Sequence, residues 1–325
     1  MRSMPDLKLT QPRLPLSRVD LTTHTAGLPP SLIAAMESEG GLWWASDAYT
    51  SADEVVETAR HVNAAALRLD FLDLRLLERL PGIRHLQVRS DGRPELDPIA
   101  ALTGLRALIL EPGALRGDLD PVVFPDLRWL RIGLGGKGGA AVLPAIQRGH
   151  EGLEWLDVNE TKARSATDVC AGFPNLRVLR IGHSDHLRDL GGLAEAAPKL
   201  EKLALDFTPI RTLDGISALE RLETLEIRGG RVRDLAPLRS LKRLRYARLE
   251  LVDLDSIEPL RDHPALRMVA FAEKQAPDSS VLASIRGLKA VWRGYGFARP
   301  VSWPELGEIS ADDPLRVEWA RALAE

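Results

Sequence analysis

The feature that most constrains this chain is a ten-residue segment that it contains twice in nearly the same form. The segment FPDLRWLRIG runs from Phe124 to Gly133, and FPNLRVLRIG runs from Phe173 to Gly182. Eight of the ten residues are identical, and the segments begin 49 residues apart. A near-repeat of this kind indicates an architecture that uses one structural unit many times.

Both segments reduce to the pattern L-x-x-L-x-L, which recurs in eleven units along the chain. Successive units begin 19 to 26 residues apart, and most begin 22 residues apart. Further apolar residues follow thirteen, sixteen and nineteen places after the first residue of a unit, as Leu235, Leu238 and Leu241 do after Leu222. The units begin at Ala64, Ile83, Leu105, Leu127, Leu153, Leu176, Leu200, Leu222, Leu244, Leu266 and Leu288.

The spacing within a unit predicts a short strand followed by turns. Alternate residues of a strand face opposite sides, so the leucines of x-L-x-L-x point inward and the residues between them point outward. One unit cannot bury its own apolar side chains, so we expect the units to stack into one parallel sheet over a filled core. The residues predicted to lie inside include Leu130, Leu156, Leu179, Leu203 and Leu225.

The phase and length of the units together resemble the leucine-rich repeat superfamily, most closely its short 22-residue class, which internalins and phosphatase regulators typify. The resemblance covers residues 64–293. It implies an α/β fold: a right-handed, curved solenoid with one parallel sheet on its concave face and helical caps at its ends. The ninth position departs from the family pattern, because Thr161, Ser184, Thr208 and several glycines stand where a buried asparagine is usual.

Three further parts are predicted outside the repeats. Residues 1–28 form an N-terminal arm. Residues 29–63 form an N-terminal cap that contains a degenerate repeat beginning at Leu42. Residues 294–325 form a C-terminal cap whose terminal helix places Trp319 on its apolar face and covers the last repeat.

The composition limits the classes of function. Hydrophobic residues make up 45% and charged residues 27% of the 325 residues, which is typical of a folded chain. The formal net charge of −3 gives no global basic field, so neither nucleic acid nor a membrane is an expected partner. The start lacks the apolar core of a secretory signal, and no apolar run reaches the roughly 20 residues of a membrane helix, so a cytoplasmic protein is expected.

Three features contain residue types that occur in chemical sites, and each has a simpler structural interpretation. The glycine-rich stretch Gly133–Ala141 follows a strand, as a phosphate-binding loop does, but lacks the G-K-[ST] ending of that motif. His183 and His186 alone make a weak metal site. Cys170 lies in an apolar segment and is predicted to be a core residue. We therefore predict no catalytic residues, no metal, no cofactor and no enzymatic activity.

The outward-facing positions carry charge in a regular pattern. The second residue is charged in ten consecutive units, and this gives two basic blocks: Arg84, Arg106 and Arg128, and then Arg245, Arg267 and Lys289. The blocks are either a solvated edge or a contact strip for an acidic partner. At the fifth position the sign alternates along Arg131, Asp157 and Arg180, which cross-strand ion pairs explain without a ligand.

Large side chains stand beside these arginines. Trp129 and Trp155 are expected to be lateral neighbours on the concave face, and Tyr246, Met268 and Trp292 follow farther along. Aromatic residues beside arginines have the composition of binding hot spots, and the alternative is packing across the sheet or cover by the C-terminal tail. The predicted partner-binding residues are Trp129, Trp155, Arg128, Arg131, Arg84, Arg106, Tyr246, Met268 and Trp292.

The first functional hypothesis is a non-enzymatic scaffold or adaptor that binds a protein partner through its concave face, as the resemblance implies. An acidic partner would suit the basic blocks. The alternatives are a cytoplasmic inhibitor or immunity-type protein that neutralises a toxin or an enzyme, and a ligand-regulated protein that uses the Gly133–Ala141 loop. The sequence names neither the partner nor the oligomeric state.

Overall fold

The structure of the chain is a computed structural model. It describes residues 16–19, 28–46, 48, 50–71, 73–89, 95–111, 124–134, 147, 149–250, 254–272, 278–293, 314, 317–319 and 322. The described strands are β1 (Ser17–Arg18), β2 (Leu42–Ser46), β3 (Ala66–Asp70), β4 (His85–Val88), β5 (Ala107–Leu110), β6 (Trp129–Gly133), β7 (Trp155–Asn159), β8 (Val178–Gly182), β9 (Lys202–Asp206), β10 (Thr224–Arg228), β11 (Tyr246–Glu250), β12 (Met268–Phe271) and β13 (Ala290–Arg293).

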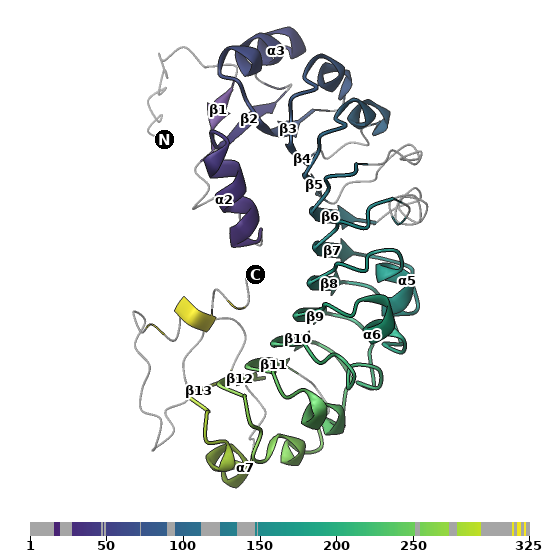
Figure 1. Ribbon diagram of the computed structural model, residues 1–325, viewed down its shortest axis with the longest axis vertical. Coiled ribbons are helices and arrows are strands. Elements are labelled where there is room, and N and C mark those ends of the chain that lie inside the picture. The colour runs from purple at the N-terminus through teal and green to yellow at the C-terminus, as the bar shows by residue number, and fades with distance from the viewer. Residues whose placement is uncertain are drawn as a thin grey trace, which may run out of the picture.

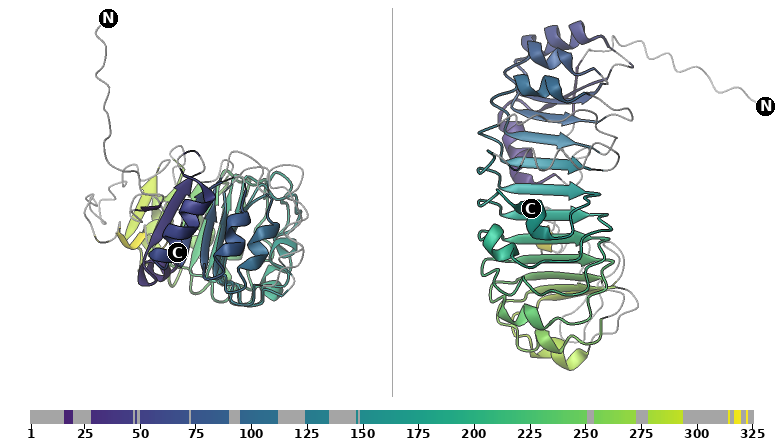
Figure 2. Two further views of the ribbon diagram at one scale, coloured as in Figure 1. Left: turned by 90° about the horizontal axis from the view of Figure 1, so that it is seen from above. Right: turned by 90° about the vertical axis from the view of Figure 1, so that its right-hand side faces the viewer.

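All thirteen strands belong to one sheet and follow one another in chain order. β1 pairs with β2 in the antiparallel direction, and β2 to β13 pair in parallel. Figure 1 shows the strands on the inner side of an arc, and Figure 2 shows them from the outer side as a stack of rungs. The predicted curved solenoid with its sheet on the concave face is therefore confirmed.

The helices lie mainly on the outer side of the arc, where the second half of each unit returns the chain to the next strand (Figure 1). Two described parts lie on the inner side instead: the helix that precedes β2, and the helical residues near the C-terminus. The α-helices are α2 (Pro30–Ser38), α3 (Ala52–His61), α5 (Ala166–Cys170), α6 (Leu193–Ala196) and α7 (Ser279–Ser284). The short 3-10 helices are η1 (Arg75–Arg79), η2 (Asp97–Ala101), η3 (Ala236–Ser240) and η4 (Glu258–Leu260).

The core follows the predicted register. The fourth-position leucines pair laterally from strand to strand, as Leu156 does with Leu130 and with Leu179. Each of them has 0% of its surface exposed, and so do the corresponding Leu203 and Leu225. Each rung thus buries its inward apolar side chains, most of them leucines, against those of its neighbours, which supplies the apolar burial that no single unit can provide.

The N-terminal end departs from the prediction in two ways. The degenerate repeat does supply a strand, β2, but Leu42 pairs with Ala66, the third residue of the next unit, rather than with Ala64. Trp43 and Ala45 therefore occupy the inward positions. In addition, residues 16–19 of the predicted arm are packed on the solenoid, because β1 pairs with β2 and Leu16 is buried.

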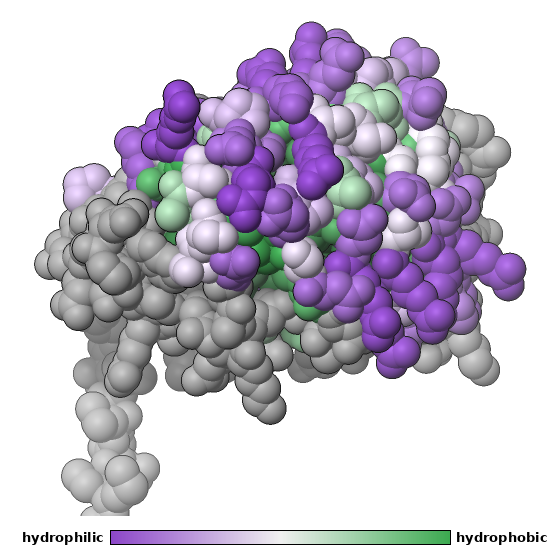
Figure 3. All heavy atoms as spheres, turned by 90° about the horizontal axis from the view of Figure 1, so that it is seen from below, coloured by the Kyte–Doolittle hydropathy of each residue, from purple (hydrophilic) through white to green (hydrophobic). Residues whose placement is uncertain are grey.

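A short helix covers the core near each end of the described solenoid. At the N-terminal end, α3 begins with the capping box that a serine followed three residues later by glutamate predicts, formed here by Ser51 and Glu54. At the other end, α7 buries Val281 and Leu282 behind the last strands. Seen from that end, the described side chains form a mainly hydrophilic surface with small hydrophobic areas (Figure 3).

Hydroxyl side chains partly replace the absent asparagine ladder. Ser184 Oγ accepts a hydrogen bond from the Thr161 backbone N–H (3.1 Å) and donates to the Gly182 carbonyl (2.8 Å). Thr161 Oγ1 accepts from the Ala163 N–H (3.1 Å), whereas the buried Thr208 Oγ1 has no partner among the described residues. These bonds satisfy backbone donors in two neighbouring turns, so the ladder is local rather than continuous.

One turn on the outer side requires glycine. Gly215 has a φ of +96°, and a Cβ atom there would lie 2.3 Å from the Leu190 carbonyl oxygen. We expect Gly215→Ala to lower the free energy of unfolding by about 1–3 kcal/mol, because it adds backbone strain and a steric clash. Gly104→Ala is the matched control, since nothing lies within 4 Å of its Cβ position and its φ is not in the positive range. Denaturant unfolding of both variants tests this, and equal midpoints would contradict it.

Candidate functional site

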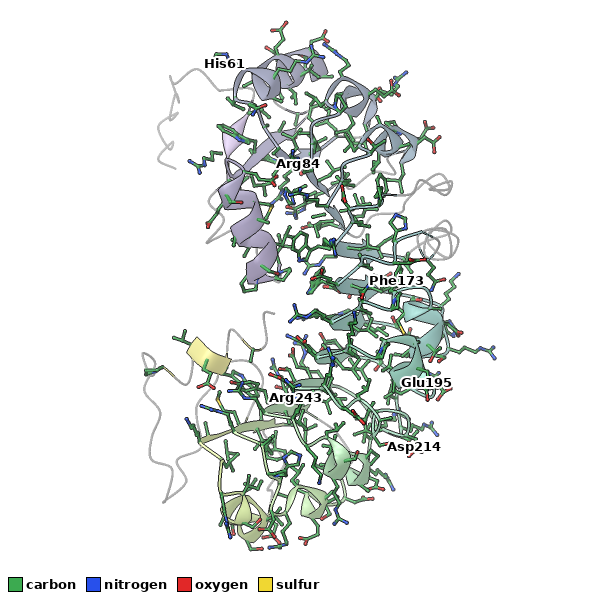
Figure 4. The ribbon with its side chains drawn as sticks, viewed as in Figure 1. His61, Arg84, Phe173, Glu195, Asp214 and Arg243 are labelled. Carbon is green, nitrogen blue, oxygen red and sulfur yellow. The ribbon has the colours of Figure 1, made fainter. Side chains whose placement is uncertain are left out.

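The concave face consists of the outward-facing side chains of the strands, and two segments of the same chain cover parts of it. Helix α2 lies over the N-terminal half (Figures 1 and 4). The C-terminal segment, of which residues 314, 317–319 and 322 are described and helical, lies over the C-terminal half. The rungs between the two segments form the central part of the face.

Helix α2 packs its apolar side chains on the predicted tryptophan site. Proline at its first position and Gly40, with a φ of +101°, mark its ends. Its Leu32 and Met36 are buried in a cluster with residues of four strands, namely Leu42, Ala66, Ala107, Ile109 and Trp155. Only 2% of the Trp155 surface is exposed. Trp129 is half-buried at the rim of the helix, and its Nε1 donates to Ser31 Oγ at 3.4 Å.

The residue that follows α2 meets the first basic block. Glu39 lies 2.9 Å from Arg106 and 3.5 Å from Arg84, measured between its Oε1 and the guanidinium nitrogens. Its other oxygen, Oε2, lies 3.1 Å from His85 Nε2. Burial lowers the pKa of His85 below its ordinary value, and Glu39 opposes this shift. Two arginines predicted to meet an acidic partner are therefore paired with a carboxylate of their own chain.

The central part of the face carries a ladder of ion pairs. Asp157 lies 3.0 Å from Arg131 and 3.8 Å from Arg180. Asp206 lies 3.8 Å from Arg180 and makes two hydrogen bonds to Arg228 of the next strand (2.6 and 2.5 Å). The predicted alternation of sign thus produces cross-strand pairs here. Farther along the pairing differs from the simple alternation, because Arg248 pairs with Glu250 of its own strand at 2.6 Å.

A buried ion pair lies next to this ladder. Lys202 Nζ is 3.0 Å from Glu226 Oε1, and each side chain has less than 5% of its surface exposed. Burial lowers the pKa of Lys202 to about 8, and the nearby Glu226 partly offsets this effect. Lys202 Nζ also donates to the Ala322 carbonyl at 3.2 Å, which ties the C-terminal segment to the sheet.

The C-terminal segment binds the second group of predicted site residues. Glu318 accepts a hydrogen bond from the Tyr246 hydroxyl (2.5 Å) and lies 3.2 Å from Arg267 and 3.9 Å from Arg245. Trp319 is buried and packs edge-on against Tyr246, with 6.3 Å between the ring centroids. Burial and the Glu318 bond raise the pKa of Tyr246 to about 12. The alternative of cover by the C-terminal tail is therefore realised on the concave face, where Trp319 packs with Met268 of β12 and with Ala290 of β13, the strand of the last repeat.

A hollow of about 620 Å³ remains between the C-terminal segment and the sheet. The segment contributes Pro314, Val317, Glu318 and Ala322 to its wall. The sheet contributes Val178, Glu201, Lys202, Glu223, Thr224, Arg245 and Tyr246. The hollow has a mixed lining of acidic, basic and apolar groups, which suits a protein segment better than a single ion.

The remaining predicted site residues are not brought together. Arg128 pairs with Glu154 at 3.0 Å on the exposed edge. Trp292 lies opposite Ala270, one row away from Met268, and its side chain lies outside the described residues. Most of the Gly133–Ala141 loop also lies outside them. The sequence reasoning missed Glu39 and Glu318, because nothing local in the sequence indicates that the termini fold back over the sheet. It also missed the Lys202–Glu226 pair, because these residues lie diagonally on neighbouring strands and not directly opposite each other.

Two of the three candidate chemical features, the histidine pair and Cys170, lie within the described residues. His183 stacks on the half-exposed Phe207, with 5.1 Å between ring centroids. Among the described residues, no group of three or more metal-ligating side chains converges. Cys170 is buried, and burial raises the pKa of its thiol to about 12, so the reactive thiolate is suppressed.

Comparison with solved structures identifies the class of fold. The internalin InlF from Listeria monocytogenes superposes with a TM-score of 0.54 at 15% identity, over 82% of this chain and 84% of that chain. TLR13 in the TLR13–ssRNA13 complex superposes with a TM-score of 0.53 at 16% identity, over 77% of this chain and 46% of that chain. No protein family and no curated protein sequence matches the chain. The chain therefore has the leucine-rich repeat fold, as its sequence pattern predicts.

One further finding concerns membranes. None of the helices in the described parts of the chain has the length and apolar character needed to cross a bilayer.

Proposed function

We propose that this chain is a non-enzymatic protein-interaction module, a scaffold or adaptor, that binds a protein partner on its concave face. The observation that carries the proposal is that the face already binds two segments of its own chain. Helix α2 and the C-terminal segment each place apolar side chains on the sheet and a glutamate against its arginines. A surface that holds helical segments in this way has the chemistry to hold those of a partner.

The partner contact is assigned to the central rungs and the hollow beside them. The hollow of about 620 Å³ is bordered by Glu201 and Glu223, which are partly exposed at the edge of the sheet. The ion-pair ladder from Arg131 to Arg228 offers charged groups of both signs, which favours specificity over bulk attraction. The basic blocks contribute less than their charge implies, since Glu39 and Glu318 already pair with four of their arginines.

Charge reversal on the two faces of the solenoid tests this proposal. We expect Glu201→Arg with Glu223→Arg to weaken binding of a partner by at least about tenfold, because it reverses the charge at the mouth of the hollow. Folding should be retained, since exposed ion pairs such as Arg177–Glu201 contribute at most about 1 kcal/mol each. The partner is captured from nuclease-treated lysate with the immobilised chain, and its affinity is then measured by titration.

The matched control carries the same change of charge on the outer side. Glu195 and Asp214 are exposed on the back of the solenoid, where Figure 4 labels them. Glu195→Arg with Asp214→Arg should leave the affinity unchanged. Loss of binding in the control, with wild-type affinity in the concave variant, would move the contact to the outer side. The nuclease treatment matters because the complex with TLR13 contains single-stranded RNA.

A further inference from the structure

We propose that the Tyr246 surface, formed by Arg245, Tyr246, Arg267 and Met268, is a binding site for a helical segment of a partner protein that carries a carboxylate next to a tryptophan. Glu318 and Trp319 occupy this surface within the chain and display the chemistry that it recognises. This inference rests on the proposed function and specifies the partner of the same face.

The Tyr246 surface holds a carboxylate through hydrogen bonds from Tyr246 and Arg267 and through the more distant charge of Arg245. The Tyr246 hydroxyl donates to Glu318 Oε1 at 2.5 Å, and Arg267 Nη2 lies 3.2 Å from the same oxygen and 3.4 Å from Oε2. Arg245 lies 3.9 Å away and stacks its guanidinium over the Tyr246 ring. A phenol and two arginines around one carboxylate form a charge-assisted site that a neutral or basic side chain cannot satisfy.

The apolar half of the site fits a large flat side chain. Trp319 is packed among Tyr246, Met268, Ala270 and Ala290, with Ala322 beside it. The two alanines of the sheet leave room for the indole ring between larger neighbours. Because glutamate and tryptophan are adjacent in the chain, one helical turn brings both groups to the sheet together. The site therefore favours a segment in which a carboxylate residue, which meets the arginines, is next to a tryptophan, which meets the alanines.

The occupant supplied by the chain itself fits the site incompletely. The buried Arg267 Nε has no hydrogen-bond partner among the described residues, although arginine can grip a carboxylate through Nε and Nη2 together. The hollow of about 620 Å³ lies directly beside Glu318, and Val317 is 58% exposed at its rim. Protein interiors are normally close-packed, so a segment that fills the hollow and satisfies Arg267 would bind better than the present one.

Helix α2 provides the contrast at the other end of the face. Its Leu32 and Met36 are almost completely buried, and Glu39 contacts two arginines and His85. The N-terminal occupant is thus a built-in part of the fold. The C-terminal one buries Trp319 but leaves a hollow beside Glu318 and leaves Arg267 Nε without a partner among the described residues. The exchangeable site is assigned to the Tyr246 surface for this reason.

A peptide supplied in trans tests the inference on the full-length chain. The probe is a fluorescent peptide with the sequence of residues 312–325, titrated against the wild type and against Glu318→Ala with Trp319→Ala. We expect it to bind this variant at least about tenfold more tightly, because in the wild type the tethered segment competes at an effective concentration in the millimolar range. The peptide should also compete with the partner captured under the proposed function.

Charge exchange identifies the contact. The chain with Glu318→Ala and Trp319→Ala is called the vacated variant. Adding Arg267→Glu to it should abolish binding of the peptide with the natural sequence of residues 312–325, and a peptide that carries Glu318→Arg should restore binding. If the vacated variant fails to fold, Glu318→Lys alone, which sets a lysine against Arg267, takes its place. Circular dichroism and thermal melting establish the fold of each variant before titration.

Three results would overturn the inference. The first is a peptide affinity for the vacated variant no higher than that for the wild type. The second is peptide binding that persists after Arg267→Glu. The third is a wild-type dimer, seen by light scattering, that becomes a monomer in the vacated variant, which would make the occupant a second copy of the chain. A chain that loses its partner through the Glu201 and Glu223 reversal, yet ignores the peptide, would keep the proposed function and lose this inference alone.

Discussion

Trp155→Ala is expected to lower the free energy of unfolding by about 3–5 kcal/mol and to release α2 from the sheet. The Trp155 ring is 2% exposed and lies in the cluster with Leu32 and Met36 of that helix. Truncation removes the buried ring and leaves a cavity that the rigid strands on either side cannot close. Denaturant unfolding measures the loss, and amide hydrogen exchange should show lost protection in residues 30–38 specifically.

Trp129→Ala is the matched control, because this ring is the lateral neighbour of Trp155 in the sheet. It is only half-buried at the rim of α2, where Nε1 makes a long hydrogen bond to Ser31. A loss of about 1–2 kcal/mol is expected, with α2 still protected. Full protection of residues 30–38 in Trp155→Ala would mean that the helix does not depend on this ring and that the ring is available to a partner.

The sequence predicts Trp129 and Trp155 as partner-binding residues, so a double alanine variant is an obvious test of binding. With α2 on top of them, a double alanine variant removes an internal contact as well as any external one. Loss of partner binding in that variant would therefore not locate the partner, whereas the charge reversals at the hollow leave the packing of α2 intact.

The repeating part of the fold is predictable from the sequence because its signal is local. The inward leucines recur with a fixed phase, and a shift by one residue would turn every one of them toward solvent. The prediction is wrong at β2, where Leu42 faces outward and Trp43 and Ala45 face inward. The physical reason is α2: its cover makes an outward position apolar, so the rule that separates inward from outward residues fails in that rung.

The cover itself is not predictable from the pattern. The packing partners of α2 in the sheet, Ala107, Ile109 and Trp155, lie about 70 to 120 residues away from it in the chain. Periodicity reports which face of an element is buried and says nothing about contacts at that separation. From the sequence, the arginine blocks and the aromatic residues are predicted to meet a partner protein. In the structure, four of the six basic residues lie against Glu39 or Glu318, each a single acidic residue with no motif around it.

Lys202 and Glu226 form a buried ion pair in which each charge is stabilised by the other. Both side chains are nearly inaccessible to solvent and lie 3.0 Å apart. A buried pair offsets the cost of removing two charges from water only while both members are present. Burial also holds the pKa of Lys202 at about 8, below the value near 10.5 that the unfolded chain would show. Stability should therefore depend both on the partner and on pH.

We expect Glu226→Leu to lower the free energy of unfolding by about 3–5 kcal/mol at pH 7, because it leaves the Lys202 ammonium buried without its carboxylate. Lys202→Met should cost a similar amount, whereas Lys202→Met with Glu226→Leu should be close to the wild type or more stable. The three variants form a double-mutant cycle measured by denaturant unfolding. Additive losses in the double variant would show that the two side chains do not stabilise each other.

The pH dependence gives an independent test of the same pair. Between about pH 8 and 10.5 the unfolded chain keeps a proton on Lys202 that the folded chain has released, so the free energy of unfolding of the wild type should rise with pH. The slope is at most about 1.4 kcal/mol per pH unit. Measurements from pH 7.5 to 8.5 lie below the ordinary pKa values of 9 for cysteine and 10 for tyrosine, above which the raised pKa values of Cys170 and Tyr246, each about 12, favour unfolding. The double variant lacks the lysine and should lose this rise; a rise that persists in it would assign the titration to another group.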